Sequence, residues 1–193
     1  MALVRTAEPS GPAVPLAEVM EYLRVSDEAD QLTVSAAIAS ATDWIEQRTQ
    51  RALITQDWRL VLDCWPRSGV VEIYRAPVVT ISSIEYVDRS GMMQTLDPSD
   101  WYFDSASAPA RLAPAIGRSW PATNGQIGAI RIDFQAGYGA MWNAVPAAIR
   151  IALMRLTAHF YENRELTAAG GSIAEIPFNL DKMLSAFVVG KPY

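Results

Sequence analysis

The sequence predicts an α+β protein, in which a small helical bundle carries an inserted antiparallel β-rich block and is followed by an extended C-terminal tail. Helical periodicity marks two N-terminal helices within 16–53 and one long C-terminal helix within 145–168. Strand-like alternation fills residues 54–144 between them. Because the β-rich block lies between helical segments, we expect it to be an insertion into a helical scaffold.

The two ends of the chain differ in composition from the domain predicted over 16–168. Residues 1–15 carry three prolines, a glycine and small side chains, which predicts a flexible N-terminal arm. Residues 169–193 contain a glycine pair at 170–171 and continue as an apolar segment. We expect this C-terminal segment either to fold back onto its own domain or to act as a docking tail on another chain.

The N-terminal helices are predicted from apolar spacing. Leu16, Val19, Met20 and Leu23 fit one face of a short helix, and a second helix is expected over about 28–50. Ser26 is a plausible N-cap for the second helix.

The β-rich block is predicted strand by strand from its alternation and its turn residues. Strands are expected at 58–64 and 127–136 from the alternating spacing of their large apolar side chains, and further strands are expected at 70–74, 78–88, 92–96 and 101–103. Residues 104–125 are rich in Ser, Ala, Pro, Asn and Gly, which indicates a long loop with one short strand near Arg111 and Leu112.

The helix at 145–165 is the longest helical pattern in the chain. Ile149, Leu153, Leu156 and Phe160 recur at steps of four, three and four, which places them on one core-facing stripe. Pro146 suits the start of a helix, where its missing N–H is tolerated.

Composition excludes several classes of function. The net charge of −5 does not indicate nucleic-acid binding by bulk electrostatics. Cys64 is alone, so an internal disulfide or a cysteine-rich zinc site is excluded. No apolar stretch resembles a signal peptide or a membrane span, and we expect a soluble protein made inside the cell.

Candidate chemical sites are weak. His159 is the single histidine and is read as structural. Asp97, Asp100 and Asp104 lack the spacing of a calcium loop. Six arginines are scattered through the end of the second helix and the first strands, namely Arg48, Arg51, Arg59, Arg67, Arg75 and Arg89. Together with Trp58 and Trp65 they could line a nucleic-acid path, although solvated faces and ion pairs explain them better. We therefore expect no catalytic residue, no cofactor and no metal. A small hydrolase or a nucleic-acid-binding module with a loop-based site remains the alternative.

Four stretches, in order, resemble the head–tail connector (adaptor) proteins of tailed bacteriophages and gene transfer agents. They are residues 15–53, the step RALITQDW at 51–58, the segment IYRAPVVTISSI at 73–84, and the helix that begins VPAAIR at 145 and ends HFYENRE at 165. The likeness covers about residues 15–190. Tyr74-Arg75-Ala76 departs from the family's more usual Leu-Pro-Arg type of turn, and the stretch at 104–125 is longer than in the family.

The resemblance implies a structural protein with no enzymatic activity. Family members form a homo-oligomeric ring, typically of twelve copies, between the portal protein at the capsid vertex and a tail-completion or stopper protein. DNA passes through the channel without specific binding. The resemblance also implies a place in the head–tail neck of a phage-like particle assembled in the bacterial cytoplasm.

In that setting the apolar residues of the tail are the expected portal-binding residues: Ile173, Ile176, Pro177, Phe178, Leu180, Met183, Leu184 and Phe187.

Overall fold

The computed structural model describes residues 1–163 and 178–190, with the side chains of Phe178 and Asn179 left aside. The described chain forms helices and antiparallel sheets, which confirms the predicted α+β class. It divides into two compact units, a β unit made of residues 1–10, 55–138 and 189–193, and a helical unit made of 11–54 and 139–188.

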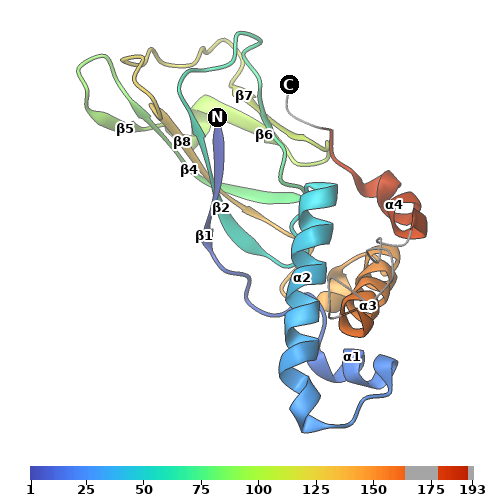
Figure 1. The fold of residues 1–193 in the computed structure, drawn as a ribbon. Coiled ribbons are helices and arrows are strands. Elements are labelled where there is room, and N and C mark those ends of the chain that lie inside the picture. The colour runs from blue at the N-terminus through green and yellow to red at the C-terminus, as the bar shows by residue number, and fades with distance from the viewer. Residues whose placement is uncertain (164–177, 191–193) are drawn as a thin grey trace, which may run out of the picture. The chain divides into compact units, whose positions relative to one another are not determined.

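The β unit contains two antiparallel sheets (Figure 1). The larger sheet has the strand order β1-β2-β8-β4-β5, and the smaller sheet has the order β3-β7-β6. The larger sheet consists of β1 (Ala2–Ala7), β2 (Gln56–Leu62), β8 (Ile130–Ala136), β4 (Val78–Val87) and β5 (Met93–Thr95). The smaller sheet consists of β3 (Val71–Ile73), β7 (Ala110–Pro114) and β6 (Trp101–Asp104).

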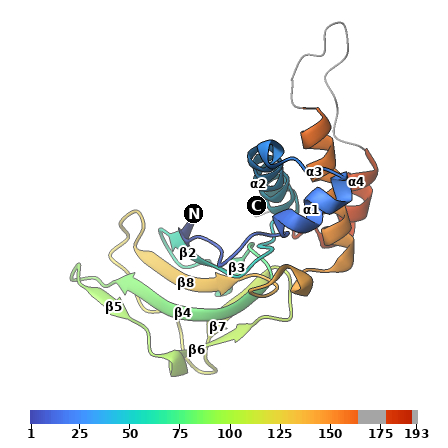
Figure 2. The ribbon, with the colours of Figure 1, turned by 90° about the horizontal axis from the view of Figure 1, so that it is seen from below.

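Alternation explains why β2 and β8 lie at the centre of the larger sheet. They pair over their full length with Leu60 opposite Ile132, so the buried side chains of both strands share one face. The opposite face is polar: Arg59 lies opposite Asp133, and its Nε and Nη2 donate to the two carboxylate oxygens at 2.7 and 2.8 Å. Figure 2 shows β4 and β8 running side by side along the curved sheet.

The first residues of the chain differ from the flexible arm expected for 1–15. Ala2–Ala7 forms β1, which pairs antiparallel with β2 and closes one edge of the sheet. Arg5 fastens this strand, because its Nη1 donates to Gln56 Oε1 at 3.4 Å and its Nη2 lies 3.3 Å from Glu8. The side chains of β1 are mostly exposed, so they show no alternation that would predict a strand. The strand forms because its backbone pairs with β2.

The loop expected at 104–125 contains β7, which joins β3 and β6 in the smaller sheet. The rest of the loop is held by two stacked indoles. The rings of Trp65 and Trp120 lie 4.2 Å apart and 5° from parallel. Trp65 Nε1 donates to the Pro121 carbonyl at 2.9 Å, and Trp120 Nε1 donates to the Gly69 carbonyl at 2.8 Å. We call this pair the Trp clasp, and it joins the turn after β2 to the loop after β7.

The helical unit contains α1 (Leu16–Leu23), α2 (Gln31–Thr49), α3 (Ala147–Glu162) and α4 (Phe178–Leu184). Short 3-10 turns adjoin these helices at Glu28–Asp30, Trp142–Ala144 and Ser185–Phe187. Asp27, rather than Ser26, caps the turn before α2, because its carboxylate accepts from the Ala29 N–H at 2.9 Å. α3 packs on α2, α1 and α4.

Candidate functional site

The predicted core stripe of the long helix lies inside the helical unit. Ile149, Leu153 and Leu156 on α3 are fully buried, and they face a core that includes Val34 and Ile45 of α2. Phe160, the fourth residue of the stripe, is half-buried near the end of α3. Its ring centroid lies 5.9 Å from that of His159.

The C-terminal segment packs on the helical unit through α4. Leu180 and Leu184 are buried, with 2% and 1% of their surface exposed. Met183 and Phe187 remain half-buried. Of the other expected portal-binding residues, Ile173, Ile176 and Pro177 lie outside the described residues, and Phe178 is described by its backbone alone.

Arginines hold α4 and the turn after it in place. Arg48 Nε donates to Asp181 Oδ1 at 2.7 Å, and Arg51 Nε donates to the Phe187 carbonyl at 2.6 Å. The Arg51 guanidinium also lies 6.0 Å from the centre of the Phe187 ring, within the range of a cation–π contact. Two arginines considered for a nucleic-acid path therefore bind the protein's own C-terminal segment.

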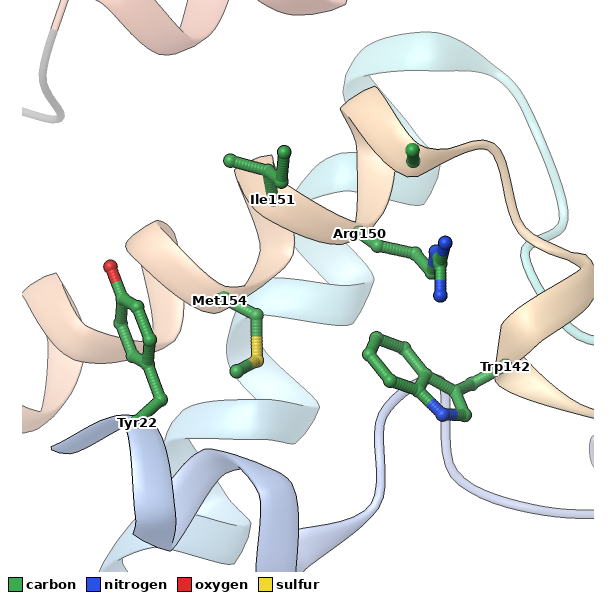
Figure 3. Close-up of a pocket in the computed structure, with 6 residues that line it drawn as sticks. Tyr22, Trp142, Arg150, Ile151 and Met154 are labelled. Carbon is green, nitrogen blue, oxygen red and sulfur yellow. The ribbon is translucent and has the colours of Figure 1, made fainter. Parts of the chain in front are cut away.

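An apolar groove opens on the helical unit, and Figure 3 shows the side chains that form it. Its volume is about 340 Å³. It is lined by Tyr22 of α1, Trp142 of the 3-10 turn before α3, and four residues of α3, namely Ala147, Arg150, Ile151 and Met154. We call it the α3 groove.

The rim of the α3 groove is exposed, and the one charged side chain that lines it, Arg150, has a hydrogen-bond donor without a partner among the described residues. Tyr22 and Ile151 expose 50% and 49% of their surface. The Arg150 guanidinium lies 4.9 Å from the centre of the Trp142 ring (Figure 3). Its Nε is buried and has no hydrogen-bond partner among the residues described. An apolar surface with one cation at its edge suits a partner that offers an apolar side chain beside a carboxylate.

Sequence reasoning did not single out the α3 groove. Ile151 and Met154 lie off the core stripe of α3, and this second apolar stripe was the signal available in the sequence. Tyr22 gave no such signal, since only the packing of α1 on α3 brings it to the groove.

The acidic residues considered as calcium ligands have separate structural roles. Asp97 accepts from the Ser99 N–H at 2.8 Å, and Asp100 lies 3.5 Å from Arg118. Hydrogen bonds from Arg111, and then from Ser107, hold the pKa of Asp104 at about 2. Within residues 1–163 and 178–190, no group of three or more His, Cys, Asp or Glu side chains could hold a metal ion.

The other candidate sites are also explained by local contacts. His159 Nδ1 lies 3.3 Å from the Asn163 side-chain amide, at the C-terminal end of α3. Arg59 pairs with Asp133, which raises the pKa of the guanidinium, and Arg75 lies 4.3 Å from the Trp58 ring. Along the described stretches, no helix combines the length and apolar character needed to cross a bilayer.

The described residues thus form an α+β protein of two units, with an exposed apolar groove on the helical one. No protein-family model matches the sequence, and neither does any of the curated proteins compared with it. Solved structures do match, and they belong to particles.

The chain is similar to a chain of the neck of an empty gene transfer agent particle, computed with C6 symmetry. The two are 28% identical with a TM-score of 0.82, over 100% of this chain and 98% of the other. Chains of a native gene transfer agent virion (28% identical, TM-score 0.80) and of a native neck computed with C12 symmetry (29% identical, TM-score 0.75) match over the same shares. These matches confirm the resemblance to the head–tail connector family.

Proposed function

We propose that this protein is a structural adaptor of the neck of a phage-like particle, where it forms a homo-oligomeric ring. The observation that carries the proposal is the match to a gene transfer agent neck chain over 100% of this chain and 98% of that one. Both units and the chain ends take part in a match of that coverage. The C6 and C12 symmetries of the matched necks support a ring, and twelve copies is the number proposed here.

The ring lies between the portal at the capsid vertex and a tail-completion or stopper protein, and DNA crosses its channel without specific binding. The four ordered sequence motifs of the connector family support this arrangement. The role is structural rather than enzymatic, which the virion and neck matches support. Assembly takes place in the bacterial cytoplasm, before the particle is released.

The C-terminal segment is the proposed portal-docking element. Because Leu180 and Leu184 are buried in the helical unit, their part in docking is to hold α4 in position. Met183 and Phe187 are half-buried and leave surface for the portal. Ile173, Ile176, Pro177 and Phe178 complete the proposed docking segment.

Imaging of assembled necks tests the proposal. The full-length chain is co-expressed with a portal protein from the same genome, and the purified complex is examined by electron microscopy. We expect a second ring stacked on the portal ring, which disappears when this chain is omitted. A portal that remains a single ring in the presence of the chain, with the chain monomeric in solution, would contradict the proposal.

A further inference from the structure

An exposed ridge runs along α2 in the helical unit. Leu32, Ala36, Ala39 and Asp43 recur at steps of four, three and four, and all four are exposed. Leu32 exposes 84% of its surface, whereas α2 buries its opposite face through residues such as Val34, Ile38 and Ile45. We call the exposed set the α2 ridge. Its two alanines leave room for another helix to approach closely.

The ridge begins beside an acidic turn. Glu28 is exposed and lies four residues before Leu32, in the 3-10 turn that leads into α2. Asp27 in the same turn is already used as a cap for the Ala29 N–H. Leu32 is therefore an exposed apolar side chain that follows an exposed carboxylate, Glu28, by four residues.

The α3 groove has the complementary chemistry. Its lining is apolar, with Ile151 and Tyr22 exposed at the rim, and its one cation is Arg150, whose buried Nε has no acceptor among the described residues. No residue of the α2 ridge lines the groove. One copy of the chain therefore carries both members of a matching pair on separate surfaces of the same unit.

We propose that Leu32 of one copy inserts into the α3 groove of the next copy, with Glu28 facing Arg150 across the contact. The alanines of the α2 ridge then pack along the exposed side of α3 around Ile151. Because the two surfaces differ, the contact is heterologous, and repeating it gives either a closed ring or an open filament. This inference rests on the proposed ring and assigns the surface by which its neighbouring copies meet.

Charge and exposure favour a second copy as the occupant. A groove that contains one guanidinium binds an apolar side chain with a neighbouring carboxylate better than an apolar side chain that has no charged neighbour or has a cation beside it. Of the large apolar side chains among the described residues, Ile116 and Ile127 are more exposed than Leu32, but neither has an acidic residue within four positions in the sequence, whereas Glu28 and Asp30 precede Leu32.

Disulfide trapping in the full-length chain tests this contact. In a background in which the exposed Cys64 is replaced by serine, we combine Leu32→Cys with Ile151→Cys and oxidise the assembled portal–neck complex. A heterologous contact gives a ladder of dimers, trimers and higher multimers on a denaturing gel. Each single variant, Leu32→Cys or Ile151→Cys, gives no ladder, because a chain with one thiol cannot form more than a dimer.

The control pair is Ile116→Cys with Ile151→Cys, since Ile116 is fully exposed but lies in the other unit. We expect at least tenfold less multimer from this pair. An equal ladder from the control pair overturns the inference, because it shows unspecific collision. Rings seen by microscopy without a ladder from the Leu32 and Ile151 pair overturn the inference and leave the proposed function standing. The absence of any ring overturns both.

A charge exchange gives a second, independent measurement. Glu28→Arg places a cation opposite Arg150, and we expect at least a tenfold smaller fraction of rings at a fixed protein concentration. Adding Arg150→Glu to the same chain restores the ring if the two side chains face each other. Failure of the double variant to recover, when its circular dichroism shows it folded, overturns the pairing.

Discussion

Glu46 is a carboxylate buried in α2, and it holds the chain where the helix ends. Its Oε1 accepts from the Leu53 N–H at 2.7 Å, in a segment where Leu53 itself is fully buried. This bond takes up a backbone donor that has no strand or helix to satisfy it. A buried carboxylate therefore fixes the path of the chain just after α2.

Replacing Glu46 with alanine leaves the Leu53 N–H buried without this acceptor. We expect Glu46→Ala to lower the free energy of unfolding by about 1–3 kcal/mol, the usual penalty for an unsatisfied buried polar group. Urea denaturation of the full-length chain measures the loss. Glu46→Gln keeps a side-chain oxygen at the same place and serves as the matched control, so an equal loss in both variants would contradict the role of the hydrogen bond.

Asp88 organises the turn between β4 and β5. Hydrogen bonds from the Ser90 hydroxyl, then from Gln94 and the Met92 N–H, hold its pKa at about 2, against an ordinary value of 3.8. Because the folded pKa is depressed, the carboxylate stabilises the folded state above pH 4, and this contribution disappears as the pH falls toward 2.

The pH dependence is tested by carboxyl carbon NMR and by urea midpoints between pH 4 and pH 2. We expect Ser90→Ala to raise the pKa of Asp88 toward 3.8, because it removes the largest cause of the shift. Asp88→Asn removes the titrating carboxyl group, so the urea midpoint of this variant should fall less between pH 4 and pH 2 than that of the wild-type chain. A pKa of Asp88 near 3.8 in the wild-type chain would contradict the hydrogen-bonded turn.

At the scale of elements, the Trp clasp holds the 115–125 loop in place through side chains, as backbone hydrogen bonds hold a strand in a sheet. Trp120→Ala removes a stacked ring, worth about 0.5–1.5 kcal/mol beyond its area, and an indole hydrogen bond worth about 1 kcal/mol. We expect the free energy of unfolding to fall by about 2 kcal/mol.

Hydrogen exchange should show which segments are destabilised in Trp120→Ala. Amides in the loop around Trp120 and in the turn at 65–69 should exchange faster in Trp120→Ala, while those of α2 and α3 keep their rates. Trp120→Phe keeps an aromatic ring opposite Trp65 and loses only the bond to the Gly69 carbonyl, so its effect should be roughly half as large. Uniform acceleration across the chain would count against a local clasp.

Helices and strands whose apolar side chains recur at a regular spacing could be predicted from the sequence. The alternation in 58–64 and the 3.6-residue stripe at 145–165 correspond to β2 and α3, because each pattern reports burial on a single face. Strand β1 gave no such pattern, and Ala2–Ala7 is ordered by a partner strand fifty or more residues away. The short strands β3 and β7 contain too few residues for a period to show.

The surfaces proposed for assembly were only partly predictable, because they depend on contacts between residues that are distant in the sequence. The apolar residues of the C-terminal segment were visible in the sequence, but their spacing did not reveal that Leu180 and Leu184 are buried on their own helical unit. The α3 groove needs Tyr22 and Trp142, which are 120 positions apart in the sequence, and no local pattern brings them together.

At the scale of the whole molecule, the C-terminal segment contributes to both units. Leu180 and Leu184 are buried in the helical unit, whereas Val189 is buried in the β unit in a cluster with Tyr74 and Ala76. A chain that ends at residue 177 should therefore lose protection against hydrogen exchange in both α3 and β3.

Leu184→Ala is the matched comparison, since it removes a buried side chain from the helical unit alone. We expect it to cost about 2–5 kcal/mol and to loosen α2 and α3 without changing exchange in β3. If the truncated chain leaves β3 fully protected, Val189 has no part in the stability of the β unit.

The chain passes between the two units four times, at residues 10, 54, 138 and 188. A single break in the backbone between Ile54 and Thr55 would leave each unit built from both fragments, with β1 held by β2 and with α2 held by α3. The nicked protein would migrate as two bands on a denaturing gel yet as one species on a sizing column. A single break in the chain would thus leave a subunit that is still held together by both of its units.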